Sequence, residues 1–225
     1  MLERMQFCLG LLLFFLGGVS SELQSFKVTL DPGHGGKFTG AQGVTTHVFE
    51  KNLTLSIAQM LAKELKAQGI NVVLTRESDV ALDDDLMTDL RKRAAKGDDA
   101  DLFVSMHLNQ VGSVHKQGFE LYIPYNESEM PLLSYMCANF MHHNLAHSVS
   151  PSWSGALKNY NEMDGGIRQA KFNVINLTKS KAAVLLELEY LSNPAGEKRI
   201  KDESYQKMLV RSIAKAILAY KDTGK

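Results

Sequence analysis

The chain has 225 residues, which is enough for one domain with a hydrophobic core. Apolar residues make up 44% and charged residues 22%, a balance that is typical of globular proteins and excludes a disordered or collagen-like chain. The 25 basic residues equal the 25 acidic ones, so the charge indicates neither a nucleic-acid-binding protein nor a polybasic membrane-surface protein.

Residues 1–20 have the layout of a secretory signal peptide: a short charged start, the apolar run 5–19 and then small residues. The run is shorter than the roughly 20 residues that span a bilayer. An uncleaved N-terminal anchor is the alternative, because the start of the chain is poorly basic. Cleavage would remove Cys8 and leave Cys137 alone, so the mature chain would have no internal disulfide. We therefore predict an exported protein.

The rest of the chain alternates between predicted strands and predicted helices. This order favours an α/β fold with three α/β/α layers, in which helices flank a central, mostly parallel twisted sheet. The run 70–75 is continuously apolar and predicts a strand that is buried on both faces. Residues 148–166 lack periodicity and predict a loop. The predicted strands are 26–30, 70–75, 101–106, 119–123 and 182–188, and the predicted helices are 52–69, 86–96, 130–146 and 205–220.

Three candidate metal ligands lie where strands or helices begin or end. His34 follows the first strand within the glycine-rich sequence DPGHGG, and His107 ends the strand DLFVSM. Glu50 stands just before the helix that starts near Asn52. Ligands of α/β sheets sit beyond the carboxyl ends of the strands, so these side chains can meet at one edge. Two histidines and one glutamate are a ligand set of catalytic zinc sites.

Glu187 is a candidate general base. It lies in the apolar strand VLLEL, where a charged group is costly unless it is paired. A carboxylate beside a metal-activated water is suited to accept its proton. The structural alternatives are common ones: a hydrogen-bonded histidine after a strand, a glutamate at a helix start and a buried glutamate in an ion pair. These four residues form no compact motif, so spacing alone leaves both interpretations open.

Several sequence pieces occur together and in order between residues 27 and 197. They are LDPGHGG (30–36), GAQG (40–43) with EKNLTL (50–55), VVLTR (72–76) with Asp79, ADLFVSMHLN (100–109), GFE (118–120), GIR (166–168), and VLLE (184–187) with LSNP (191–194). In this combination the chain resembles the zinc-dependent N-acetylmuramoyl-L-alanine amidases that remodel bacterial cell walls.

The resemblance implies a function and a site. It implies a catalytic domain over residues 26–222, Zn²⁺ held by His34, Glu50 and His107, and Glu187 as the catalytic base. The reaction would hydrolyse the amide bond between N-acetylmuramic acid and L-alanine in peptidoglycan, for wall remodelling or daughter-cell separation. Arg168 would orient Glu187 or bind a substrate carboxylate.

The same resemblance leads to expectations about location and partners. We expect a periplasmic protein, or one on the extracellular cell-wall side, whose substrate is peptidoglycan. We expect a monomer with contacts to the division machinery, no nucleic-acid partner and no stable membrane insertion after signal cleavage.

The sequence departs from the family pattern at Glu189, where a small residue is usual. Strand alternation predicts that Glu189 shares a face with Glu187, where it could raise the pKa of Glu187 or compete as the base.

Three other functions stay open: a zinc peptidase acting on the stem peptide, a catalytically inactive wall-binding division protein, and a serine-type D-Ala carboxypeptidase. The last rests on Ser113 in a Ser-x-x-Lys tetrad. His143 and His147, one helical turn apart, are a weaker metal candidate.

Activator-dependent members of the family carry a long insertion that folds into a helix over the metal. The corresponding interval here, 124–165, is shorter. Its predicted helix, 130–146, has an apolar stripe that favours packing on the sheet. We therefore predict activity without an activator, with Glu162 as the first suspect for a plug if this prediction is wrong. The stripe consists of Leu133, Met136, Cys137, Phe140 and Met141.

Overall fold

The computed structural model describes residues 25–128, 131–148 and 166–224. Its strands form one six-stranded sheet within this part of the chain, in the order β2-β1-β3-β6-β4-β5. The strands are β1 (Lys27–Pro32), β2 (Asn71–Leu74), β3 (Leu102–Asn109), β4 (Glu120–Pro124), β5 (Ile167–Ala170) and β6 (Ala182–Tyr190). The helices are α1 (Glu50–Ala67), α2 (Leu86–Ala95), α3 (Leu132–Ser148), α4 (Asn173–Leu177), α5 (Pro194–Lys201) and α6 (Glu203–Lys221).

The sheet is mostly parallel. β1 pairs in parallel with β2 and β3, β3 with β6, and β4 with β5, whereas β4 and β6 are antiparallel. The carboxyl ends of β1, β3 and β6 therefore meet at one edge of the sheet, which is where parallel sheets place their ligands.

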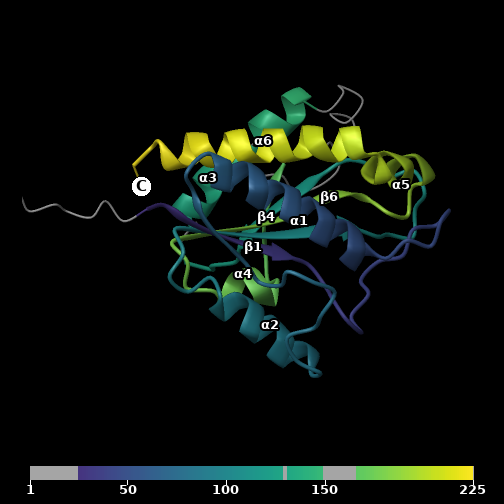
Figure 1. Ribbon diagram of the computed structural model, residues 1–225, viewed down its shortest axis with the longest axis horizontal. Helices are drawn as coiled ribbons and strands as arrows, with labels where there is room; N and C mark the ends of the chain where they lie inside the picture. The colour runs from purple at the N-terminus through teal and green to yellow at the C-terminus, as the bar shows by residue number, and fades with distance from the viewer. Residues whose placement is uncertain (1–24, 129–130, 149–165, 225) are drawn as a thin grey trace, which may run out of the picture.

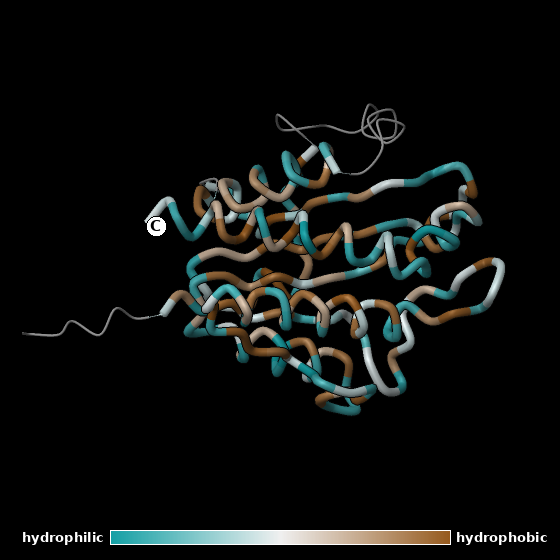
Figure 2. Tube along the Cα trace, turned by 45° about the horizontal axis from the view of Figure 1, so that its top comes forward, coloured by the Kyte–Doolittle hydropathy of each residue, from teal (hydrophilic) through white to brown (hydrophobic). Residues whose placement is uncertain are grey.

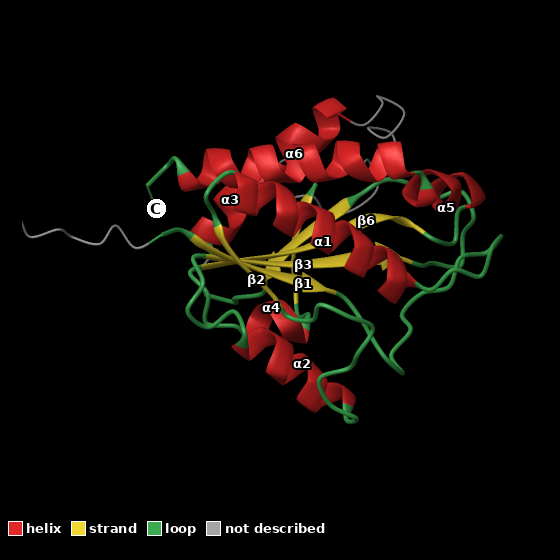
Figure 3. Ribbon diagram, in the orientation of Figure 1, coloured by secondary structure: helices red, strands yellow, loops and turns green. Residues whose placement is uncertain are grey.

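Helices cover both faces of the sheet. Figures 1 and 3 show α1, α3 and α6 on one side and α2 and α4 on the other, so the predicted α/β/α fold is confirmed. In Figure 2 hydrophobic residues follow the strands and the inward turns of the helices, as expected for two cores separated by a sheet. The α3 stripe packs as predicted: Cys137 and Met141 are buried in the larger core, and Leu133, Met136 and Phe140 lie against it.

Two expectations about the fold need correction. The strand at 70–75 was expected to be buried on both faces, but β2 is an edge strand with Asn71 exposed and Val73 and Leu74 only half-buried. Glu50 was expected just before a helix, whereas α1 begins at Glu50.

Some sequence predictions fall outside the described residues. The proposed signal peptide at 1–20 lies there, as do 149–165 of the predicted loop and Glu162. None of the helices within 25–128, 131–148 and 166–224 is long and apolar enough to cross a membrane.

Candidate metal site and its surroundings

The structure brings His34, Glu50 and His107 together. The two oxygens of Glu50 face one histidine each: Oε1 lies 2.9 Å from Nδ1 of His107, and Oε2 lies 3.1 Å from Nε2 of His34. One ligand atom from each of the three side chains falls within 4.8 Å of the others, and no second cluster of this kind occurs in the described part of the chain. Two imidazole nitrogens and a carboxylate at this spacing form a donor set suited to zinc.

Backbone amides fix the carboxylate of Glu50. Oε2 accepts a hydrogen bond from the amide of Ala41 at 2.7 Å, and Oε1 accepts one from the amide of Leu108 at 2.9 Å. Ala41 lies in the loop before α1 and Leu108 lies in β3, so the two bonds tie the helix start to the sheet. Such outer contacts orient a ligand before the metal arrives.

Glycines make room for these ligands. A side chain at Gly33 would place its Cβ 2.6 Å from Nε2 of His107. At Gly40, which has φ of +69°, a Cβ would lie 2.5 Å from Oε2 of Glu50 and from Cδ2 of His34. Both positions therefore require glycine, one for space and the other for space and backbone conformation.

The electrostatics of the trio favour a charged cluster. Burial alone would raise the pKa of Glu50, but the hydrogen bonds with His107 and His34 hold that pKa well below its usual range. Burial would lower the pKa of His107, but the neighbouring Glu50 raises it to about 9. A negative carboxylate lies between two imidazoles here. In such an environment a divalent cation would displace protons from the imidazole nitrogens.

Glu187 lies on the neighbouring strand, directly opposite His107 in the register of β6 on β3. Its Oε2 is buried and has no hydrogen-bond partner among the described residues. Burial raises the pKa of Glu187 to about 8, with Glu50 and Glu120 adding to the effect and His107 opposing it. A half-buried carboxylate with a raised pKa and one oxygen that has no hydrogen-bond partner can both accept and return a proton near neutral pH.

Glu189 does not share the face of the strand that carries Glu187, so the prediction from strand alternation is wrong. The β3–β6 register shifts after His107 and Glu187, so that Asn109 pairs with Tyr190, and the extra residue interrupts the alternation of side chains. The Glu189 carboxylate instead accepts hydrogen bonds from the amides of Gly118 and Tyr190 and from Arg199. Glu189 is thus a fully buried partner of α5, and it is absent from the groups that shift the pKa of Glu187.

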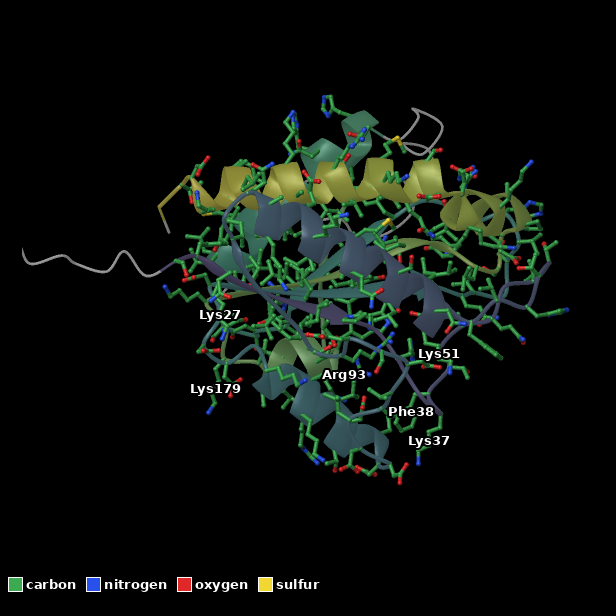
Figure 4. All side chains as sticks on the ribbon, in the orientation of Figure 1. Lys27, Lys37, Phe38, Lys51, Arg93 and Lys179 are labelled. Carbon is green, nitrogen blue, oxygen red and sulfur yellow. The ribbon has the colours of Figure 1, made fainter. Side chains whose placement is uncertain are left out.

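Two buried arginines hold the loop that carries His34. Arg93 of α2 donates to the carbonyls of Pro32 at 3.0 Å and His34 at 2.6 Å, while Arg76 donates to those of Pro32 and Gly33 at 3.0 Å each. His34 has φ of +61°, an uncommon conformation for a residue with a side chain, so the arginines stabilise a strained turn. Figure 4 labels Arg93 between the sheet and α2.

Arg93 is itself neutralised by two carboxylates. It is 1% exposed and pairs with Asp31 at 3.0 Å and with Asp89 at 2.6 Å. Asp31 also accepts hydrogen bonds from Thr75 at 2.5 Å and Ser105 at 2.7 Å. Sequence reasoning assigned no role to Arg76 or Arg93, because their partners come from distant segments and only the fold brings them together.

Arg168 joins a polar cluster on the other side of Glu187. It donates to Glu120 Oε1 at 3.0 Å and to the Tyr122 hydroxyl at 3.2 Å. Glu120 also accepts hydrogen bonds from Asn109 at 2.7 Å and from Tyr122 at 2.8 Å, and it lies opposite Glu187 in the β4–β6 register. Sequence reasoning noted the GFE piece but assigned no function to Glu120.

The remaining candidates, Ser113, His143 and His147, do not belong to the metal cluster. Ser113 is in a non-helical loop and its hydroxyl accepts from the amide of His115, so the tetrad lacks the helical turn that would align Ser113 with Lys116. His143 and His147 have ring centroids 4.2 Å apart, but Nδ1 of His147 contacts the carbonyl oxygen of His143 and the groove beside them contains Arg211 and Lys215. Two cations disfavour a metal there.

Comparison with known proteins identifies the family. Residues 28–219 match the family model of N-acetylmuramoyl-L-alanine amidases. A probable cell wall amidase, LytH of Staphylococcus aureus, is 32% identical over 199 residues, which are 88% of this chain and 59% of that protein. The chain therefore spans 59% of the length of this curated relative.

Solved structures show the same relationship. The catalytic domain of CwlV, an N-acetylmuramoyl-L-alanine amidase from Bacillus (Paenibacillus) polymyxa var. colistinus, is 34% identical with a TM-score of 0.71, covering 88% of this chain and 98% of that one. An N-acetylmuramoyl-L-alanine amidase from Clostridium difficile 630 is 29% identical with a TM-score of 0.74, covering 89% and 99%. The chain belongs to the N-acetylmuramoyl-L-alanine amidase family.

Proposed function

We propose that this protein is a zinc-dependent amidase that hydrolyses the bond between the lactyl group of N-acetylmuramic acid and L-alanine in peptidoglycan. One observation carries the proposal: the donor atoms of His34, Glu50 and His107 converge within 4.8 Å, and Glu187 lies opposite His107 on the next strand. Family membership supports the substrate, because the family is named for cleavage of this bond.

The residues present fit a zinc ion. Two neutral imidazoles and one carboxylate are a protein ligand set that leaves a coordination position open for water or substrate. When bound, zinc supplies a Lewis acid that polarises the scissile carbonyl and lowers the pKa of the attacking water. His34, Glu50 and His107 would hold it.

Glu187 would carry out the proton transfers. Its carboxylate accepts a proton from the attacking water, and the water oxygen becomes bonded to the lactyl carbonyl carbon. The same proton then passes to the departing nitrogen of L-alanine as the C–N bond breaks, leaving a lactyl carboxylate and a free amine. A pKa raised to about 8 suits a group that serves first as base and then as acid.

We also propose that the protein acts outside the cytoplasmic membrane as an exported catalytic domain. The substrate lies in the cell wall, and residues 1–20 have signal-peptide composition. The domain would extend over 26–222, act as a monomer and make contacts with the division machinery.

Activity without an activator is part of this proposal. The apolar stripe of α3 lies against the core, with Cys137 and Met141 buried, so this helix is held on the sheet. The test is turnover by purified zinc-loaded protein alone. No turnover until a partner is added, or until part of 149–165 is deleted, would contradict it.

The experiment that tests the function is chromatography of peptidoglycan digested with the purified protein. We expect free stem peptides that begin with L-alanine, their loss on addition of a chelator and their return with zinc. Shortened peptides still attached to muramic acid would instead indicate a zinc peptidase. Binding without any cleavage product would indicate a wall-binding protein.

A further inference from the structure

Arg76 is a buried arginine whose hydrogen bonds all go to neutral groups. It is 2% exposed, and no carboxylate in the described part of the chain forms an ion pair with it. Arg93, in contrast, pairs with both Asp31 and Asp89. A buried charge without a counter-ion is costly, so neutralisation does not explain the place of Arg76. Its acceptors are the carbonyl oxygens of Pro32, Gly33, Lys51 and Ser78 and the hydroxyl oxygen of Thr54.

One nitrogen of Arg76 connects the segments that carry two of the candidate metal ligands. Nη2 donates to the carbonyl of Gly33 at 3.0 Å and to the carbonyl of Lys51 at 2.7 Å. Gly33 directly precedes His34, and Lys51 directly follows Glu50. The same planar group therefore holds the main chain beside both ligands.

The rest of the Arg76 side chain is fixed as well. Nε donates to the carbonyl of Pro32 at 3.0 Å, and Nη1 donates to the carbonyl of Ser78 at 3.1 Å. The turn packs closely on the side chain, because a Cβ at Gly35 would lie 2.9 Å from Cδ of Arg76. These contacts leave the guanidinium one orientation, which is a requirement for a group that sets a distance.

Thr54 makes the same connection from α1. Its hydroxyl donates to the carbonyl of Gly33 at 2.9 Å, and Nη2 of Arg76 lies 3.3 Å from the hydroxyl oxygen. Thr54 is fully buried and lies one helical turn after Glu50. The carbonyl of Gly33 thus accepts hydrogen bonds both from Arg76 and from the helix that carries Glu50.

We propose that Arg76 and Thr54 form a clamp that sets the position of His34 relative to Glu50 and so determines how tightly the site holds zinc. Both are positioning residues, because neither belongs to the metal cluster. The inference rests on the proposed function, in which the cluster holds zinc. Ligands that are held in place before the metal arrives lose less freedom when it binds.

The test is the zinc dissociation constant, measured by competition with a chromophoric chelator under conditions in which each variant is folded. Arg76→Met should weaken zinc binding about 10- to 100-fold, the range for outer partners of metal ligands. Thr54→Val keeps the shape of the side chain and removes one hydrogen bond, so it should weaken binding about fivefold. This second variant decides the test if Arg76→Met does not fold.

Arg76→Lys separates the geometry of the clamp from its charge. Lysine keeps the positive charge but lacks the planar fork that reaches several carbonyls at once. Its zinc affinity should therefore stay close to that of Arg76→Met. Wild-type affinity in Arg76→Lys would show that only the charge matters and would overturn the clamp.

Ser134→Ala is the matched control for Thr54→Val. Ser134 is a buried hydroxyl on α3 that accepts a hydrogen bond of 3.0 Å from the amide of Ala183, and neither residue belongs to the metal cluster. The variant should lower the free energy of unfolding in urea and leave the zinc dissociation constant unchanged. The visible absorption of bound Co²⁺, which follows ligand geometry, should shift in Thr54→Val and stay the same in Ser134→Ala.

The outcomes separate this inference from the proposed function. Wild-type zinc affinity in Thr54→Val would overturn the clamp and leave the amidase function standing. Equal losses of affinity in Thr54→Val and Ser134→Ala would show that affinity follows overall stability, which would also overturn it. A wild-type protein that binds no zinc would overturn the proposed function and this inference with it.

Discussion

Arg93, on α2, donates a hydrogen bond of 2.6 Å to the main-chain carbonyl of His34, a candidate metal ligand. The contact joins a buried ion-pair network to a residue whose backbone adopts positive φ. The position of the His34 imidazole therefore depends on a side chain that does not itself reach the metal site.

Replacing Arg93 should weaken both the fold and the metal site. Arg93→Met removes the partner of Asp31 and Asp89, and breaking a buried pair in this way typically costs about 3–5 kcal/mol. The free energy of unfolding in urea measures this loss, and zinc titration should show weaker binding.

The matched control for this change is Arg91→Met, two residues away on the exposed side of α2. It should change the free energy of unfolding by no more than about 0.5 kcal/mol. Similar losses in the two variants would show that the buried network has no special role.

Glu187→Gln should remove activity but keep zinc. Glutamine fills the same space but cannot accept the proton, and loss of a general base typically costs about 10²- to 10⁴-fold in rate. Steady-state kinetics and metal analysis of the purified variant check both parts.

Glu189→Gln is the variant to compare with Glu187→Gln. Glu189 pairs with Arg199 away from the metal trio, so this variant should lose stability while keeping most of its turnover. If Glu189→Gln were the more damaging change to turnover, or if Glu187→Gln lost zinc, the roles assigned here would be wrong.

Acid should destabilise the fold through Asp31. Burial alone would raise the pKa of Asp31, but Arg93 and the hydrogen bonds from Thr75 and Ser105 bring it below the usual value of 3.8. A carboxyl whose pKa is lower in the folded state contributes stability above its unfolded pKa, and this contribution is lost as the pH falls through the folded value. The free energy of unfolding should therefore fall below about pH 4.

Asp31→Asn tests this origin of the acid sensitivity. The variant should be less stable than the wild type at pH 7, and the difference between the two should shrink between pH 4 and pH 2. Parallel stability curves over this range would assign the acid sensitivity to other carboxyls.

Removing zinc should abolish hydrolysis and leave the fold intact. His34, Glu50 and His107 lie at the edge of a sheet whose two cores are packed without them. Far-UV circular dichroism should be the same before and after chelation, unlike that of a zinc finger, whose fold depends on the metal. Unfolding on chelation would mean that the metal is structural.

The sequence was sufficient to predict those parts of the site that lie at the ends of strands. His34 follows β1 and His107 lies near the end of β3, and these are adjacent parallel strands, so the convergence of the two histidines follows from the order of elements. The long helices α1 and α6 carry clear periodicity, and Gly69, with φ of +77°, stands two residues after the end of α1 at Ala67. These features follow from the order of the elements and from helical periodicity, and both can be recognised in the sequence.

What the sequence did not predict depends on contacts between distant segments. β5, α4 and α5 have four, five and eight residues, too few to show a period. The place of Glu189 depends on the β-bulge in β6, and the burial of Arg93 depends on carboxylates from two other segments. Residue type alone cannot indicate such partners.

The most direct test of the central claim is hydrolysis of peptidoglycan in water enriched in ¹⁸O, followed by mass spectrometry of the products. Because the water oxygen becomes bonded to the carbonyl carbon that is attacked, we predict ¹⁸O in the lactyl carboxylate of muramic acid and none in the released stem peptide. Label in a peptide carboxylate, with muramic acid still joined to L-alanine, would contradict the account.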